Sequence, residues 1–284
     1  MEAVRLSAHV TMLPGDRGGA FPHGNPLVVR GGDTAVQIDS SIAHRAGDVD
    51  LVLLSHGHED HMVGLGATTA PVMVHRRDVE TVQSWEEYRR VTHLVERENA
   101  EDLRRTFALT ERPDATSFDD DAVIDVGGGV TIGVVPLPGH TAGHCGFYVE
   151  PDGVFFTADV DLSSFGPVYC DEGSVLADVR ASLARCAEID AAVYATFHHK
   201  GCYTDRDRYR ADLAVHTNVV DVREERIRAL LQDRARSAVA PAELVGQGVV
   251  FTVGGRRPWY ADTMEEHIIA AHLVEPGQPA GISG

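Results

Sequence analysis

The sequence has no apolar run long enough to cross a membrane. Its first residues, Met1 to Arg5, also lack the apolar segment of a secretory signal peptide. Over 284 residues, 43% are hydrophobic and 24% are charged, which is ordinary for a globular protein. We therefore expect a cytoplasmic protein with no membrane partner, whose chain is long enough for one large α/β domain with or without a small appendage.

Positive charge is scarce. The 25 Lys and Arg residues face 43 Asp and Glu residues, which gives a formal net charge of −18. Proteins that bind nucleic acid cluster Lys and Arg against the phosphates. This balance argues against a nucleic-acid partner and favours a small-molecule substrate.

Cysteine is also rare. Cys145, Cys170, Cys186 and Cys202 are widely spaced and form no Cys-x-x-Cys pair. The spacing indicates reduced thiols in a cytoplasmic protein. Cys145 adjoins His144, and we expect it to be a small buried residue of a strand.

Three catalytic signatures are missing. The chain contains no Gly-x-Ser-x-Gly elbow, no phosphate-binding P-loop and no dinucleotide-binding Gly-x-Gly-x-x-Gly. A serine nucleophile, a bound nucleotide or a dinucleotide cofactor therefore has no motif to support it.

What the sequence does contain is the cluster Ser55-His56-Gly57-His58-Glu59-Asp60-His61, directly after the apolar residues 51–54. The apolar run predicts a short buried strand. Imidazole nitrogens and carboxylate oxygens are typical ligands of zinc and related divalent metals. Four such side chains on one tight loop cannot all reach one tetrahedral ion and leave an open position. The spacing therefore predicts two neighbouring ions, with His56 and His58 on the first and Asp60 and His61 on the second.

The His-x-His-x-Asp-His cluster resembles the signature of the metallo-β-lactamase-fold hydrolases. This resemblance implies an αββα four-layer sandwich of two mixed β-sheets flanked by helices. It also implies further ligands at later strand ends, where the sequence offers His140 after a Pro-Gly turn, Asp159 after an apolar run, and His198 or His199 after the last strand.

The resemblance assigns these residues to the two ions. His140 would join His56 and His58 in a site with an open fourth position. His198, with His199 as the alternative, would join Asp60 and His61. Asp159 would bridge the ions at the roughly 3.5–4 Å separation of two-metal hydrolytic sites, with Asp161 as a weaker candidate. We expect two zinc ions, with iron or manganese as alternatives.

Other residues are expected near the metals. The resemblance implies that Asp39 supports the metal loop. His144 is either a support of the ligands or the start of a strand. His199 would face the substrate if His198 is the ligand, and His23 lies with Phe21 on a Gly- and Pro-rich loop that could flank the substrate. The chain also departs from the family in two places: Ala158 stands where glycine usually precedes the bridging Asp, and Ser40-Ser41 stands where glycine often follows Asp39.

Hydrophobic periodicity and turn signals predict the remaining elements. Strands are expected at residues 4–12, 27–30, 34–38, 51–54, 71–74, 123–126, 130–135, 145–150, 154–159 and 191–197. Helices are expected at 62–67, within 76–112, at about 174–188, from about 205 onward, near 241–246 and at 262–274.

These elements suggest two parts, residues 1–204 as the metallo-β-lactamase-like domain and residues 205–284 as a helical C-terminal extension. Within the first part, residues 76–118 form a helical insertion. Its stripe of Trp85, Tyr88, Val91, Leu94 and Val95 is either a packed helix face or part of a lid that lends Trp85 or Tyr88 to the substrate pocket. The extension carries an amphipathic stripe with an Arg/Glu-rich opposite face. Its His216, His267 and His272 are expected to be packed or exposed and not to bind metal.

The resemblance implies a hydrolase that attacks an ester, thioester or lactone with a metal-bridging hydroxide. Asp60 would help to move the proton of that water. A β-lactam is a less attractive substrate, because nothing in the sequence indicates export. The alternative is an iron-dependent persulfide dioxygenase or another redox member of the same fold. A binding module without activity usually has degraded ligands, whereas every expected ligand is present here.

Overall fold

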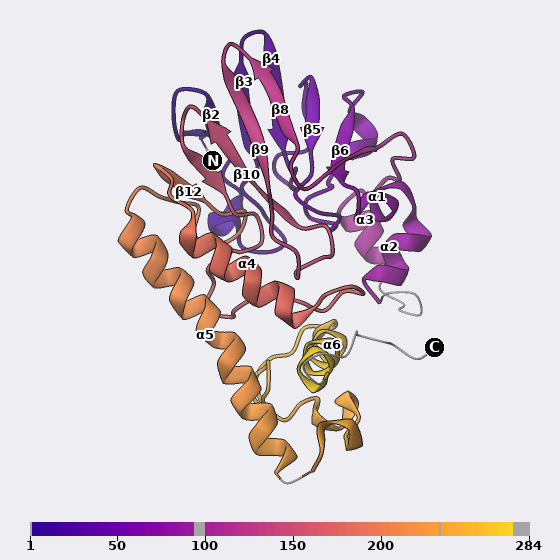
Figure 1. Cartoon of the computed structure of the whole chain (residues 1–284). Helices are drawn as coiled ribbons and strands as arrows, with labels where there is room; N and C mark the ends of the chain where they lie inside the picture. The colour runs from indigo at the N-terminus through magenta and orange to yellow at the C-terminus, as the bar shows by residue number, and fades with distance from the viewer. Residues whose placement is uncertain (1, 94–99, 233, 275–284) are drawn as a thin grey trace.

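The first seven strands form one mixed sheet, in the order β1 to β7 (Figure 1). In the computed structural model, which describes residues 2–93, 100–232 and 234–274, these strands are β1 (Val4–Arg5), β2 (Val10–Met12), β3 (Leu27–Gly31), β4 (Thr34–Ile38), β5 (Leu51–Leu53), β6 (Val72–His75) and β7 (Thr116–Phe118). Strands β1 to β4 are antiparallel, and β4 to β7 are parallel. The single strand expected over residues 4–12 is wrong: the chain bends between β1 and β2, and Val4 pairs with Met12.

The second sheet has six strands in the order β13-β12-β11-β10-β9-β8. They are β8 (Val123–Gly127), β9 (Val130–Pro136), β10 (Cys145–Glu150), β11 (Val154–Phe156), β12 (Val193–Ala195) and β13 (Cys202–Tyr203). Strands β11 and β12 are parallel, because helix α4 (Leu176–Glu188) crosses between them, and the other pairs are antiparallel. Two mixed sheets with outer helices confirm the predicted fold class.

The two sheets pack face to face over a buried core. Leu53 of the first sheet and Phe147 of the second both belong to this core, and both are fully buried. The neighbours of Leu53, Val52 and Leu54, point to the opposite face and pack under helices. Strand β5 is therefore buried on both faces, which explains its uninterrupted apolar sequence.

Helices α1 (Val79–Gln83), α2 (Trp85–Val91) and α3 (Ala100–Thr106) cover the outer face of the first sheet (Figure 1). Trp85 stacks on the buried Tyr88, with ring centroids 5.1 Å apart. Both side chains pack in this layer, as expected for a packed helix face, and the Tyr88 hydroxyl donates to Glu59 over 2.6 Å. Leu94 and Val95 of the predicted stripe lie outside the described residues.

Helices α4, α5 (Arg206–Leu231) and α6 (Ala261–Leu273) pack on the outer face of the second sheet. Short 3-10 helices complete the chain: η1 (Asp16–Gly19), η2 (Leu65–Ala67), η3 (Arg236–Ala238) and η4 (Pro241–Leu244). The amphipathic stripe expected from the sequence is present on α5, whose buried residues also include one charged side chain, Arg223, which is 1% exposed. The buried residues of α5 are Tyr209, Leu213, His216, Val220, Arg223, Ile227 and Leu231. No helix among residues 2–93, 100–232 and 234–274 is long and apolar enough to span a bilayer.

Candidate metal centre

The predicted ligands come from four loops that follow strand ends. The loop after β5 carries His56 to His61, the turn after β9 carries His140, the turn after β11 carries Asp159, and the turn after β12 carries His198. The Cys145 N–H donates to the Ser55 carbonyl over 2.9 Å, which joins the two sheets beside the first loop. These loops meet at one edge of the sandwich and bring all seven predicted ligands together.

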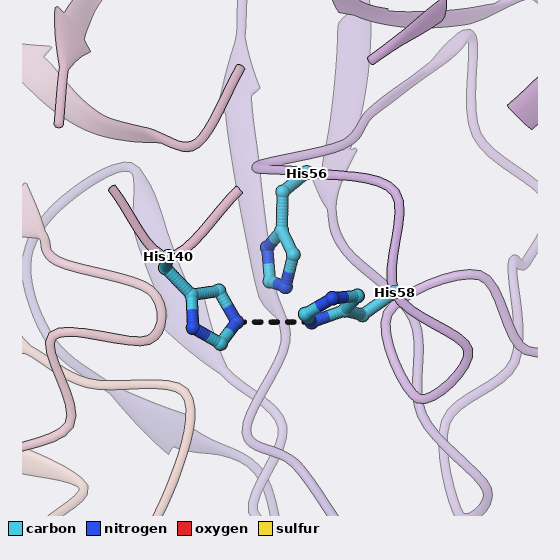
Figure 2. Close-up of side chains that lie close together, drawn as sticks. All are labelled: His56, His58 and His140. Atoms are coloured by element: carbon cyan, nitrogen blue, oxygen red, sulfur yellow. Dashed lines mark hydrogen bonds between the residues drawn. The ribbon is translucent and has the colours of Figure 1, made fainter. Parts of the chain in front are cut away.

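His56, His58 and His140 form the first group. Each offers a ring nitrogen within 4.8 Å of the others, and the three rings face a common space (Figure 2). The shortest separation is 2.9 Å, between His58 Nδ1 and His140 Nε2. The structure thus brings together the three histidines that were expected to share one ion.

Asp60, His61 and His198 form the second group, which is fully buried. His198 Nε2 lies 3.0 Å from Asp60 Oδ2. Asp159 lies between the two groups: its Oδ1 is 3.0 Å from His61 Nε2, and its Oδ2 is 3.3 Å from His140 Nε2. Asp159 therefore contacts residues of both groups, where the resemblance implies a bridging carboxylate.

The structure brings His198 into the cluster and leaves His199 outside it. His199 has a backbone φ of 58°, and its Nε2 lies 3.6 Å from Asp161 Oδ2. Neither His199 nor Asp161 belongs to any of the candidate metal-binding groups found among the described residues. The geometry therefore favours His198 over His199, and Asp159 over Asp161.

Four buried polar atoms of the cluster have no hydrogen-bond partner among the residues that the structure describes. They are His56 Nε2, Asp60 Oδ2, His61 Nε2 and Asp159 Oδ1. A buried polar group without a partner costs about 1–3 kcal/mol. Divalent cations would satisfy all four atoms, and a donor set of imidazole nitrogens and carboxylate oxygens suits zinc. The residues present therefore fit two metal ions.

In four of these histidines, the ring nitrogen that does not face the cluster lies within hydrogen-bond distance of an acceptor oxygen. Because carboxylate and carbonyl oxygens only accept, these nitrogens carry the hydrogen, and each ring turns its lone pair toward the cluster. The bonds are His58 Nε2 to Asp171 Oδ2 (2.7 Å), His140 Nδ1 to the Val168 carbonyl (2.9 Å), His61 Nδ1 to Asp39 Oδ2 (2.9 Å) and His198 Nδ1 to the Gly19 and His23 carbonyls (2.7 and 2.9 Å).

Asp39 holds the loop that carries His56 to His61. It is fully buried, and its two oxygens accept from the Ser55 backbone N–H and hydroxyl, each over 2.7 Å. Its third contact is with His61. Asp39 therefore holds both the start of the loop and one of the predicted ligands.

His144 holds Asp159 in place. Its Nδ1–H donates to the Leu137 carbonyl over 2.9 Å, and its Nε2 accepts from the Asp159 backbone N–H over 3.2 Å. Burial, followed by the nearby His140, lowers the pKa of His144 to about 3, so the ring stays neutral and can accept. Ala158 has a φ of 47°, a conformation that glycine adopts more easily, which gives a physical reason for the glycine usual at this position.

His23 contributes its backbone to the site. Its carbonyl accepts from His198, whereas its ring Nδ1 is buried without a partner among the described residues. Phe21, two residues earlier, is 42% exposed, and its ring lies 6.4 Å from that of His198. The loop of residues 14–26 therefore borders the second group.

Two functional residues escaped the sequence analysis. Asp171 holds His58, and Asp78 accepts from the Thr141 hydroxyl, the Gly143 N–H and the Gly57 N–H at 2.5, 2.7 and 3.3 Å. Asp78 thus fastens the turn of His140 to the loop of His56. It follows the end of a parallel strand, a position where polar side chains often serve a site, and that signal could have identified it.

The carboxylates dominate the electrostatics of the cluster. Burial alone would lower the pKa of His58, but Asp171 outweighs burial and raises it to about 9. Burial would likewise lower the pKa of His198, whereas Asp159 and Asp60 raise it to about 10. Burial would raise the pKa of Asp159, but His61 and His198 hold it well below its usual range. The cluster thus attracts positive charge strongly.

Comparison with known proteins gives a consistent assignment. The family model of the metallo-beta-lactamase superfamily matches residues 24–199. No protein of curated function matches the chain.

Solved structures share its fold. A metallo-beta-lactamase family protein from Thermus thermophilus is 21% identical, with a TM-score of 0.70 over 94% of this chain and 93% of that one. A beta-lactamase domain protein from Burkholderia ambifaria is 17% identical, with a TM-score of 0.66 over 95% and 86%. The native FEZ-1 metallo-beta-lactamase from Legionella gormanii is 13% identical, with a TM-score of 0.57 over 77% and 93%.

The family model covers more than half of the chain, and its matched residues contain every predicted ligand. The fold of two packed mixed sheets agrees with that match. The protein belongs to the metallo-beta-lactamase superfamily.

Proposed function

We propose that the protein is a dinuclear metal-dependent hydrolase that cleaves an acyl bond in an ester, thioester or lactone. One observation carries this proposal: two buried groups of ligands share Asp159, and four of their inward-facing atoms have no partner among the described residues. His56, His58 and His140 would hold the first ion, and Asp60, His61 and His198 the second. Asp159 would contact both.

The ions would supply a nucleophile at neutral pH, because a divalent cation lowers the pKa of a bound water from 15.7 to about 7. Asp60 would be close enough to that water to accept its proton, because it belongs to the second group, in which its buried Oδ2 lies 3.0 Å from His198 Nε2. We propose Asp60 as both a ligand and the residue that carries this proton to the leaving group. No serine or cysteine nucleophile is required.

The surrounding residues keep the ligands in place and dry. Phe197 stacks on His61, with ring centroids 3.7 Å apart. Cys145 is buried, and burial raises the pKa of its thiol, so it stays protonated and takes no part in the reaction. We propose that a small-molecule substrate enters on the side of Phe21, because its ring is 42% exposed and lies 6.4 Å from that of His198.

We propose zinc in both sites, because imidazole nitrogens and carboxylate oxygens, the donors of both groups, are typical zinc ligands. Iron or manganese would be accepted by the same donors, and a redox reaction on iron is the competing function. Metal analysis with an absorption spectrum, followed by ester, thioester, lactone and persulfide substrates, distinguishes them. Zinc with hydrolysis supports the proposal, and iron with persulfide oxidation overturns it.

Replacing His58 tests the site directly. We expect His58→Ala to lower turnover at least a thousandfold without loss of fold, because the first ion loses a ligand. The control is His9→Ala, whose ring bonds Asp152 outside the cluster. Near-normal turnover by a folded, metal-analysed His58→Ala protein would refute the proposed role.

A further inference from the structure

The segment from Ser163 to Glu172, here called the support loop, contacts the first group of ligands at two points. The Val168 carbonyl accepts from His140 Nδ1, and the Asp171 carboxylate accepts from His58 Nε2. Both bonds determine which nitrogen of each ring faces the cluster. The support loop therefore sets the orientation of two of the three histidines in the first group.

The C-terminal helices hold the support loop from behind. Arg223 of α5 donates from Nη1 to the Pro167 carbonyl over 2.5 Å and from Nη2 to the Phe165 carbonyl over 2.9 Å. Its guanidinium also lies over the rings of Phe165 and Tyr169, 5.3 and 5.4 Å from their centroids. Val168 lies between these contacts in the chain, so its carbonyl has little freedom to move.

Two further bonds reinforce this attachment. His216 of α5 donates from Nδ1 to the Ser163 carbonyl over 2.9 Å. The Tyr169 hydroxyl bonds His272 Nε2 of α6, also over 2.9 Å. The support loop is thus fastened at its start and at its middle, on either side of the Arg223 contacts.

Packing alone does not explain a charge at position 223. The residue occupies an apolar position of the α5 stripe, between Val220 and Ile227, and it is 1% exposed. It forms no ion pair with any carboxylate in the described ranges 2–93, 100–232 and 234–274. A buried charge is costly, and a hydrophobic residue of similar volume is often neutral or stabilising in its place. Arg223 differs from such a hydrophobic residue in one respect: its planar guanidinium group binds two backbone carbonyls at once.

We propose that Arg223 is a positioning residue for the first metal site. It fixes the support loop, and the loop in turn fixes His140 through Val168 and His58 through Asp171. This inference rests on the proposed metal binding and adds a role for the C-terminal helices in it. Arg223 itself touches neither substrate nor metal.

Metal titration tests this role independently of activity. Metal-free protein is titrated with Co²⁺ followed by absorption and with Zn²⁺ followed by calorimetry, and His140→Ala identifies the binding step of the first site. In Arg223→Met we expect the affinity of that step to fall 10- to 100-fold, the usual effect of losing support behind a ligand. The other step is expected to stay unchanged. Arg223→Lys should give an intermediate loss, since a point charge cannot bind two carbonyls as the fork does.

Arg226→Met is the matched control. Arg226 is exposed on the same helix and donates to the Gly248 and Val249 carbonyls, each over 3.1 Å, away from the support loop. The Arg226→Met substitution should leave the affinities of both metal-binding steps unchanged. If Arg223→Met does not fold, two milder variants decide the question by the same selective loss of affinity at the first site. They are Arg223→Lys and Tyr169→Phe, the second of which removes the hydroxyl that bonds His272.

Two results would overturn the role of Arg223. The first is an unchanged metal affinity of Arg223→Met at the first site. The second is an equal loss of affinity at both sites that follows a fall in melting temperature. A wild-type protein that binds no divalent cation would instead refute the proposed function, and this inference with it. The two failures are therefore distinguishable from the wild-type titration alone.

Discussion

At the scale of single residues, the candidate centre depends on acceptors behind the histidines. Asp39 and Asp171 fix the protonated ring nitrogens of His61 and His58, and three loop carbonyls fix those of His140 and His198, so that the lone pairs of the four rings converge. A histidine free to rotate would have to be ordered when the metal binds, at a cost in conformational entropy. The structure avoids much of that cost because the rings are already oriented.

Asp171 allows a test of this preorganisation. We expect Asp171→Ala to weaken metal binding at the first site 10- to 100-fold, because His58 loses its only carboxylate acceptor among the described residues. The measurement is a zinc titration of the metal-free protein. Glu172→Ala is the control, since Glu172 is 44% exposed and pairs with Arg90. Equal effects of the two substitutions would contradict a specific role of Asp171.

The sequence pointed to the residues that converge in the candidate centre, but not to most of the residues that support them. His56 to His61 form one contiguous motif at a strand end, whereas His140, Asp159 and His198 were expected from the family resemblance and from their places after apolar runs. Asp171 and Arg223 belong to no motif, and their roles arise only when distant segments meet. Arg223 did leave one signal, because it falls at an apolar position of the α5 stripe.

At the scale of elements, Glu224 ties the C-terminal helices together. It lies on α5 and pairs with Arg236 of η3 and with His272 Nδ1 of α6, the latter at 3.0 Å. His272 in turn bonds Tyr169 of the support loop. One carboxylate thus connects three elements with the loop behind the candidate centre.

The pKa of Glu224 gives this connection a pH dependence. Burial acts to raise the pKa, but the bonds from Arg236 and His272 outweigh burial and lower it from 4.5 to about 2. A lowered carboxyl pKa stabilises the fold above pH 4.5, and this stabilisation is lost as the pH falls toward about 2. Glu224→Gln should therefore destabilise the protein at pH 7, and the difference from wild type should shrink between pH 4.5 and 2.

Urea unfolding at several pH values measures this effect. Glu225→Gln is the control, because it removes the same charge from the neighbouring exposed position of α5. A stability difference for Glu224→Gln that stays constant down to pH 2 would show that the Glu224 pairs do not contribute.

Most elements were predicted within a few residues, and the exceptions have local causes. The helical pattern over 76–112 is broken because Ser84 has an extended backbone, which ends α1, and its side chain then caps α2 through the Glu87 N–H. Strand β11 stops at Phe156, before the left-handed turn at Ala158 that presents Asp159. Backbone turns of this kind leave little trace in hydrophobic periodicity.

At the scale of the whole molecule, metal binding should stabilise the fold. A ligand that binds only the folded state at 100 times its Kd adds about 2.7 kcal/mol, which corresponds to roughly 5 °C or more in melting temperature for a chain of this size. We therefore expect chelation to lower the melting temperature and added zinc to restore it. The His58→Ala protein should respond less. A melting temperature unaffected by chelator in a metal-loaded sample would contradict the coupling.

The packing of the C-terminal helices also bears on how much of the chain the candidate metal centre needs. The region that matches the family stops at residue 199, although Tyr209, Leu213 and Ile268 share a core with Val160 and Tyr169 beside the ligands. A protein shortened to the matched region would keep every predicted ligand in its sequence. It would lose the C-terminal helices that, through the support loop, orient His58 and His140. The smallest active form of this protein should therefore be longer than its recognisable homology.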